Sequence, residues 1–364
     1  MSDYKIGCDA HKKFSQFAVR DGAGKLIQQK RVEHEEGAIR AFLSEYPVGT
    51  PVALETVGNW YWIVDEIEAS ECIPHMAHAA KAKVMMGNVH KTDKIDAAGL
   101  AMLEHLNSLP KVWIPSGEQR DQRELPRTRM FMKKHVIGLK NRLHATLAKY
   151  AICIDREDIF AGQGRKDLES AIAHMPTETA YCFQQELAVL DNLETQIKEL
   201  EKRIRSRNKT SRECELIKTL PGLGDILALV VECEAGSIER FASCEHFASY
   251  AGVVPKEQSS GGKVRFGHML SESNHYLKWA FIEAANVISS HRNAPSWRNK
   301  HVVHLYERIR ARKGHTKAIG AVARHLAEAA FWVLKKGQPY REPTPHLPKQ
   351  AYARGEAGLL KTGD

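Results

Sequence analysis

Acidic residues at four positions of the sequence could together hold metal ions. Asp9 ends the apolar stretch "IGCD" and Glu55 ends "VALE", so we expect each at the carboxyl end of a buried strand. Asp93 and Asp96, in "KTDKIDA", are one helix turn apart and share a helix face. Carboxylates held this close repel each other unless cations neutralise them. The spacing therefore predicts a metal site, provided that the strands and the helix converge.

The same acids also suggest which metal and which chemistry. Oxygen ligands favour hard cations, so the cluster predicts Mg²⁺, with Mn²⁺ as the alternative. Metals bridged by carboxylates can activate a nucleophile and stabilise a leaving oxygen in phosphoryl transfer. Taken singly, Asp9 could cap a turn, Glu55 could pair with a lysine, and Asp93 could be a helix N-cap. Their joint order along the chain favours a nuclease of the ribonuclease H type.

Residues 1–126 alternate between strand and helix patterns, which predicts an α/β domain. A first strand in "YKIGCD" is followed by a hairpin over 14–32, built around an Asp-Gly-Ala-Gly turn. Helices are expected over 36–46 and 60–70, with strands over 51–56 and 72–78. This order indicates a mixed sheet of the ribonuclease H type rather than an all-parallel one. Trp60 and Trp62 are expected in the core.

Residues 127–208 predict long helices. Leu193, Ile197, Leu200 and Ile204 repeat by four, three and four, the spacing of a coiled-coil seam. The stretch 127–149 is basic and contains no acid. A solvated helix face is one interpretation, but the missing acids favour a helix that faces nucleic acid. The basic residues concerned are Arg127, Arg129, Lys133, Lys134, Lys140 and Arg142.

Residues 209–342 predict a second, mainly helical globular domain, followed by a flexible tail over 343–364. In "LPGLGDILALVVECE" a glycine-rich turn joins two helical stretches. A helix-hairpin-helix that grips phosphate and an ordinary αα-corner are equally compatible with this spacing. The segment 298–317 is a further basic surface that could contact a nucleic-acid backbone.

Composition sets broader limits. The 364 residues contain 53 Lys and Arg against 44 Asp and Glu, a formal charge of +9, which favours a polyanionic partner. The seven cysteines are scattered and contain no Cys-x-x-Cys pair, which indicates reduced thiols. No apolar stretch is long enough to cross a bilayer, and the N-terminus lacks a secretory signal pattern. We therefore expect a soluble, intracellular protein with no membrane partner.

Several stretches together resemble one known family. "GCDAHK", "ALETVGNWYW", "HKTDKIDAAGLA" and "VWIPSGEQRDQREL" resemble the RuvC-like domain of the Asp-Glu-Asp-Asp (DEDD) insertion-sequence transposases, which include the Piv-type DNA invertases. The stretch from "LPGLGDILALVVECE" to "SNHYLKWAFIEAA" resembles the family's C-terminal transposase domain. The resemblance covers residues 4 to about 340, with its motifs in the family's order.

This resemblance implies specific site residues. Asp9, Glu55, Asp93 and Asp96 correspond to the family's metal-binding tetrad. In "PKEQSSGGKVRFGHM" the family's nucleophilic serine corresponds best to Ser260.

The same stretch leaves alternatives open. Ser259 is the neighbouring alternative to Ser260, and Lys263 and Arg265 are basic residues beside the phosphate path. Read without the family, the stretch is a polar, exposed loop. Tyr250 and Tyr276 are competing nucleophiles that we interpret as packing residues on helices.

The resemblance also implies partners. Donor and target DNA would be paired with a structured noncoding guide RNA from the element. A homo-oligomer, a dimer or a tetramer assembled by the helical region, would bring the serine of one domain to the metal of another. The protein would act in the bacterial cytoplasm, at the nucleoid. Two other functions are compatible with the residues: a RuvC-like hydrolytic nuclease that resolves Holliday junctions with water as nucleophile, and a non-catalytic nucleic-acid-binding scaffold.

Overall fold

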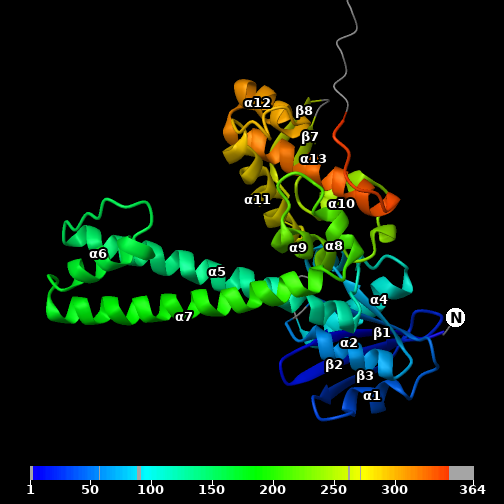
Figure 1. Ribbon diagram of the computed structural model, residues 1–364. Helices are drawn as coiled ribbons and strands as arrows, with labels where there is room; N and C mark the ends of the chain where they lie inside the picture. Colours follow the sequence, from blue (N-terminus) through cyan, green and yellow to red (C-terminus); the bar gives the residue numbers. More distant parts are fainter. Residues whose placement is uncertain (1–2, 57, 88–91, 261–262, 271, 344–364) are drawn as a thin grey trace, which may run out of the picture. The chain divides into compact units, whose positions relative to one another are not determined.

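The computed structural model describes residues 3–56, 58–87, 92–260, 263–270 and 272–343 (Figure 1), and of 257–260 and 263–266 it describes the backbone. All of the expected tail over 343–364 except residue 343 lies outside the described residues. The chain divides into two compact units, 1–120 (the N-terminal unit) and 121–364 (the C-terminal unit). All seven cysteines are free thiols. No helix in the described part of the chain is long and apolar enough to span a membrane.

The N-terminal unit is built on a six-stranded mixed sheet of order β3-β2-β1-β4-β5-β6. Strands β1, β4 and β5 are parallel, whereas β2, β3 and β6 are antiparallel to their neighbours. This arrangement fits a ribonuclease H-like domain and confirms the predicted hairpin. The strands are β1 Lys5–Ala10, β2 Phe14–Arg20, β3 Leu26–Glu33, β4 Pro51–Glu55, β5 Ile73–Ala77 and β6 Lys111–Val112.

Helices cover both faces of this sheet. Apolar side chains on one face, such as Ile6 and Val52, pack with α1 and α2 in one hydrophobic cluster. Small side chains on the other face, such as Ala18 and Ala53, pack against α4. The sequence patterns did not predict α3. The helices are α1 Ala38–Leu43, α2 Trp60–Ala69, α3 Ala79–Met86 and α4 Asp93–His105.

Two long helices of the C-terminal unit run antiparallel, joined through α6 (Figure 1). They are α5 Gly117–Lys149 and α7 Thr177–Asn208, with α6 at Gly162–Ile172. The predicted coiled-coil seam is buried inside the chain at Ile197 and Ile204, so its partner there is not another copy. The boundary between the two units falls within α5, a few residues before the expected domain boundary at 126.

The rest of the C-terminal unit is mainly helical around one large core. The predicted glycine turn does join two helices, α8 and α9. A Cβ atom at Gly222 would lie 2.5 Å from the carbonyl oxygen of Ala284 on α11, which favours the αα-corner over a phosphate-gripping turn. The elements are α8 Arg212–Ile217, α9 Asp225–Ala235, η1 Ile238–Arg240, α10 Cys244–Tyr250, β7 Pro255–Ser260, β8 Lys263–Met269, α11 His275–His291, α12 His301–Lys313 and α13 His315–Lys336.

A buried carboxylate connects several elements of this unit. Glu234 on α9 is fully buried and accepts hydrogen bonds of 2.7 and 2.9 Å from the Arg127 guanidinium on α5. Asn274, the N-cap of α11, donates to the same carboxylate at 2.9 Å. Its backbone N–H bonds the carbonyl of Tyr250 at the end of α10. Glu234 therefore ties α5 to the elements on either side of the β7–β8 hairpin.

Glu234→Gln should lower the free energy of unfolding by about 3 kcal/mol, because removing one partner of a buried ion pair leaves the other charge uncompensated. Urea denaturation followed by tryptophan fluorescence measures the loss. Glu328→Gln is the control, since the Arg324–Glu328 pair is partly exposed to solvent within one helix and its loss should cost less than about 0.5 kcal/mol. Equal losses in the two variants would contradict the structural importance of Glu234.

Candidate active site

The site depends on how closely helix α4 approaches strand β1. Gly7 on β1 has no side chain, and a Cβ atom there would overlap the carbonyl oxygen of Ala97 and lie 2.6 Å from the nitrogen of Ala101. Thr92 fixes the start of α4, because its hydroxyl accepts the Ile95 N–H at 3.3 Å. The first turn of α4 is therefore held against the sheet.

Strand register brings the first two acids together. The parallel pairing of β1 with β4 runs through Cys8 and Leu54, and Asp9 and Glu55 are the next residues along these strands. Since side chains alternate along a strand, both project on the same face as Gly7, where α4 lies. The expectation that Asp9 and Glu55 lie at the carboxyl ends of strands is confirmed, and the two strands are neighbours.

A histidine completes the centre of this cluster. The His11 Nε2 atom lies 3.1 Å from Asp9 Oδ2 and 3.3 Å from Asp93 Oδ1. Among the described residues, Asp9, His11 and Asp93 form a group whose ligand atoms all lie within 4.8 Å of one another. Sequence reasoning missed His11, although its position two residues after Asp9 was a usable signal. Glu55 and Asp96 are not part of this closest group.

The electrostatics of Asp9 reflect its burial first and the neighbouring acids second. Burial raises the pKa of the Asp9 carboxyl above its usual range, and the charges of Asp96 and Asp93 raise it further. His11 acts in the opposite direction, by its charge and by its hydrogen bond. The cluster thus contains more negative charge than its own residues neutralise, which is the condition that a bound cation relieves.

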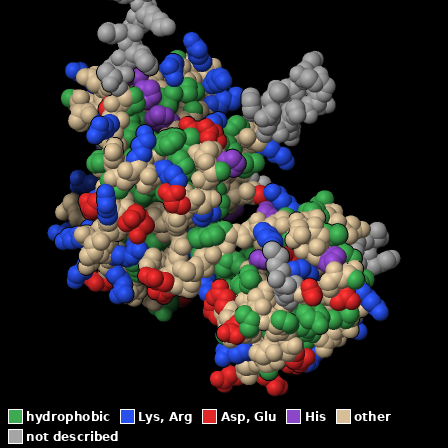
Figure 2. Space-filling model, turned by 90° about the vertical axis from the view of Figure 1, so that its right-hand side faces the viewer, with side chains coloured by type: hydrophobic (Ala, Val, Ile, Leu, Met, Phe, Trp, Pro, Cys, Tyr) green, Lys and Arg blue, Asp and Glu red, His purple; other side chains and the backbone are tan. Residues whose placement is uncertain are grey.

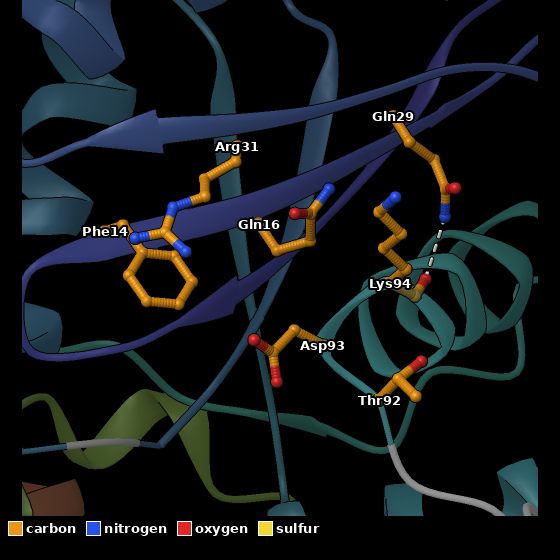
Figure 3. Close-up of a pocket in the computed structure, with 7 residues that line it drawn as sticks. All are labelled: Phe14, Gln16, Gln29, Arg31, Thr92, Asp93 and Lys94. Atoms are coloured by element: carbon orange, nitrogen blue, oxygen red, sulfur yellow. Dashed lines mark hydrogen bonds between the residues drawn. The ribbon is translucent and has the colours of Figure 1, made fainter.

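A pocket of about 520 Å³ lies beside the cluster, and Figure 3 shows Asp93 projecting from the start of α4 toward the sheet side that carries Phe14 and Gln16. Gln29 on β3 donates to the Lys94 carbonyl at 2.9 Å, which ties this part of the sheet to α4. Asp93 lines this pocket, so a ligand bound in the pocket would contact the acidic cluster.

Comparison with known proteins identifies the family. A transposase model of the DEDD type of IS110 matches residues 6–152, and a model described as "Transposase IS116/IS110/IS902 family" matches residues 214–302. The chain belongs to the DEDD transposases of the IS110 type. It is therefore a DNA transposase of an insertion sequence, and its family generally uses a divalent metal.

Named relatives agree along most of the chain. A transposase for insertion sequence element IS1111A from Coxiella burnetii is 24% identical over 94% of this chain and 92% of its own length. A probable family 20 transposase from Pseudomonas aeruginosa is 23% identical, covering 78% and 83%. An uncharacterized IS110 protein from Streptomyces coelicolor is 32% identical over 36% of this chain and 31% of its own length.

The two candidate nucleophiles of the transposase lie on a strand, not in a loop. Ser259 and Ser260 are the last residues of β7, where their backbones pair with Val264 and Lys263 of β8. The polar stretch that we expected to be an open loop is therefore a β-hairpin. Lys263 and Arg265 belong to β8, the second strand of this hairpin.

The competing tyrosines and the two tryptophans have structural surroundings. Tyr250 and Tyr276 pack against the C-terminal core, which confirms their interpretation as packing residues. Trp60 packs against the core of the N-terminal unit. Trp62 was expected in the core, but it is 37% exposed and contacts His34 edge-on. Trp62 lies outside the buried face of α2, which is formed by Ile63, Val64 and Ile67.

Several basic residues of α5 form ion pairs with acids on other helices. Arg127 pairs with Glu234 on α9, and three further residues pair with acids on α7. These distant partners explain why the stretch 127–149 contains no acid of its own. These pairs favour an intramolecular role over the predicted nucleic-acid contact, whereas Lys134 is exposed and Lys133 half-buried. On the face shown in Figure 2, Lys and Arg are interspersed with Asp and Glu. The α7 pairs are Arg129–Glu201, Lys140–Glu194 and Arg142–Glu186.

Gly7→Ala should cost about 2 kcal/mol of stability or more, because the added methyl group has no space against the backbone of α4. It should also weaken divalent-metal binding, since α4 carries Asp93. Thermal unfolding with and without metal measures both effects. Gly58→Ala is the control in the same unit, because a Cβ atom there meets nothing within 4 Å. A Gly7→Ala protein with unchanged stability would exclude the close packing.

Asp9→Asn should raise the melting temperature of the metal-free protein. The raised pKa of Asp9 means that the folded state favours the neutral form, so the wild type loses stability as pH rises from the ordinary aspartate range through the folded-state pKa. The advantage of the variant should therefore grow with pH. A saturating divalent metal should reverse the order, adding about 2.7 kcal/mol to the wild type alone at one hundred times the dissociation constant. If the divalent metal raised the melting temperature of Asp9→Asn as much as that of the wild type, the metal site at Asp9 would be contradicted.

Proposed function

We propose that this transposase cuts and rejoins DNA through a phosphoserine intermediate, with Ser260 as nucleophile and Mg²⁺ at the acidic cluster. The observation that carries the proposal is the convergence of Asp9 and Asp93 on one point, with Glu55 in register beside Asp9. The raised pKa of Asp9, caused first by its burial and then by the neighbouring acids, is consistent with a cation at this position.

The acids would hold the cation, and the serine would carry the DNA. Asp9, Glu55, Asp93 and Asp96 are the proposed ligands of Mg²⁺, with Mn²⁺ as the alternative. When bound, the cation would neutralise the developing charge on the phosphate and lower the pKa of a hydroxyl.

The Ser260 oxygen would attack phosphorus as its proton departs. The ester bond to one deoxyribose oxygen would break, and that oxygen would take up a proton. The phosphoserine ester conserves the bond, so a hydroxyl of the new DNA partner can attack it and release the serine. Ser259 is the alternative nucleophile.

Contacts to nucleic acid complete the proposal. Lys133, Lys134, Lys263 and Arg265 are the proposed backbone contacts, together with the basic segment 298–317. Four other basic residues of α5 have acidic partners in their own chain, so we expect a smaller contribution to nucleic-acid binding from them. They are Arg127, Arg129, Lys140 and Arg142. The substrates are donor and target DNA, guided by a noncoding RNA of the element.

A homo-oligomer, a dimer or a tetramer, would combine the acids with the serine of another copy. Action at the bacterial nucleoid, in the cytoplasm, follows from the DNA substrate.

Ser260→Ala should abolish a covalent protein–DNA adduct, because the variant lacks the attacking oxygen. A denaturing gel with labelled element ends, the element's noncoding RNA and Mg²⁺ detects the adduct. Ser259→Ala is the matched control and should form it normally. Asp93→Asn should lose the adduct as well, through loss of the metal, with binding to DNA retained.

Two outcomes would point to the other functions. Normal cleavage by Ser260→Ala without an adduct in the wild type would indicate a hydrolytic nuclease with water as nucleophile. Wild-type protein that binds DNA but cuts none with Mg²⁺ and the element's noncoding RNA present would indicate a non-catalytic scaffold. Either result contradicts the serine mechanism.

A further inference from the structure

We propose that His11 is a nitrogen ligand of the metal site and makes this site prefer Mn²⁺ over Mg²⁺. The inference rests on the proposed function in so far as that function places a divalent metal at Asp9 and Asp93. The inference goes beyond that function because it adds a metal ligand outside the acidic tetrad and attributes the metal preference of the site to this ligand.

The position of the imidazole nitrogen is the first argument. His11 Nε2 lies between two carboxylates of different elements, 3.1 Å from Asp9 and 3.3 Å from Asp93. A single nitrogen can donate one N–H, so it cannot make two full hydrogen bonds here. Its direction is instead that of a group aimed at the point where the two carboxylates converge, which is the point of greatest attraction for a cation.

The imidazole is also held in this direction. Its ring stacks on Phe14 with centroids 4.6 Å apart and an angle of 23° between planes. The Arg31 guanidinium lies 3.6 Å from the centre of the same Phe14 ring (Figure 3). Asn59 donates to the His11 carbonyl at 2.8 Å, and the His11 N–H bonds the Phe14 carbonyl at 2.9 Å. Turning the ring away from an arriving cation would break the stack.

A cation entering between Asp9 and Asp93 would take the place of the Nε2 proton, because the imidazole binds a metal only as the neutral ring with its N–H on Nδ1. Typical metal–ligand distances are about 2.0–2.2 Å for imidazole nitrogen and carboxylate oxygen, so small shifts from the present spacing suffice. Imidazole is a softer donor than carboxylate and suits transition metals better than Mg²⁺. One nitrogen among oxygens should thus tilt the site toward Mn²⁺.

Pulsed electron paramagnetic resonance of the full-length protein with Mn²⁺, without nucleic acid, tests this directly. We expect a ¹⁴N coupling to Mn²⁺ in the wild type. His11→Phe keeps a ring to stack on Phe14 but has no nitrogen, so it should lose the coupling and weaken Mn²⁺ binding by about tenfold or more. Mg²⁺ affinity, measured by competition, should change by a smaller factor. His11→Asn should behave like His11→Phe.

Controls separate this inference from folding and from the proposed function. His105→Asn, in the last turn of α4, should keep the ¹⁴N coupling. Asp9→Asn should weaken the binding of both Mn²⁺ and Mg²⁺. Metal-free thermal unfolding verifies that the His11 variants fold. A coupling absent from the wild type, or still present in His11→Phe, would overturn the inference while leaving the serine adduct in Mg²⁺ unaffected. Loss of the adduct in the wild type would instead contradict the proposed function alone.

Discussion

Helix α4 packs directly on the backbone of strand β1, and the acidic cluster exists because of this contact. Asp9 and Asp93 are far apart in the chain, and their charges oppose any approach. The missing side chain at Gly7 allows the helix to lie close enough, and small residues on the flanking strands extend the same surface. The favourable packing of α4 thus outweighs local repulsion, so the fold holds the site together before any cation binds.

The N-terminal unit was predictable because its signals are local. Strand ends fix where Asp9 and Glu55 project, and the hairpin turn fixes which strands are antiparallel. Helix α4 was readable from Asp93 and Asp96 and the apolar run after them, although its N-cap is Thr92 and not Asp93. His11 had a weaker signal, its position two residues after Asp9, because its importance depends on the direction of the ring. That direction comes from stacking on Phe14, which only the three-dimensional hairpin supplies.

The C-terminal unit was harder to predict because its decisive contacts are distant in sequence. The basic stretch 127–149 looked unpaired, yet its acids lie on α7 and α9, beyond the reach of any local pattern. The heptad on α7 was correctly periodic, but periodicity does not say whether the partner helix belongs to the same chain. The β7–β8 hairpin was missed because polar, glycine-rich strands lack an alternating apolar signal.

Buried acids with a structural role differ from Asp9 in one physical respect. Glu234 is matched by arginine and asparagine donors. Burial alone would raise the pKa of Glu104, but hydrogen bonds from His75 and Lys111 hold it below its usual range. Asp9 pairs with no Lys or Arg among the described residues, and its pKa is raised. The buried acids Glu104 and Glu234 are paired with Lys or Arg, whereas the half-buried Asp9 has His11 as its partner, which is the electrostatic signature expected of a site that works with a bound metal.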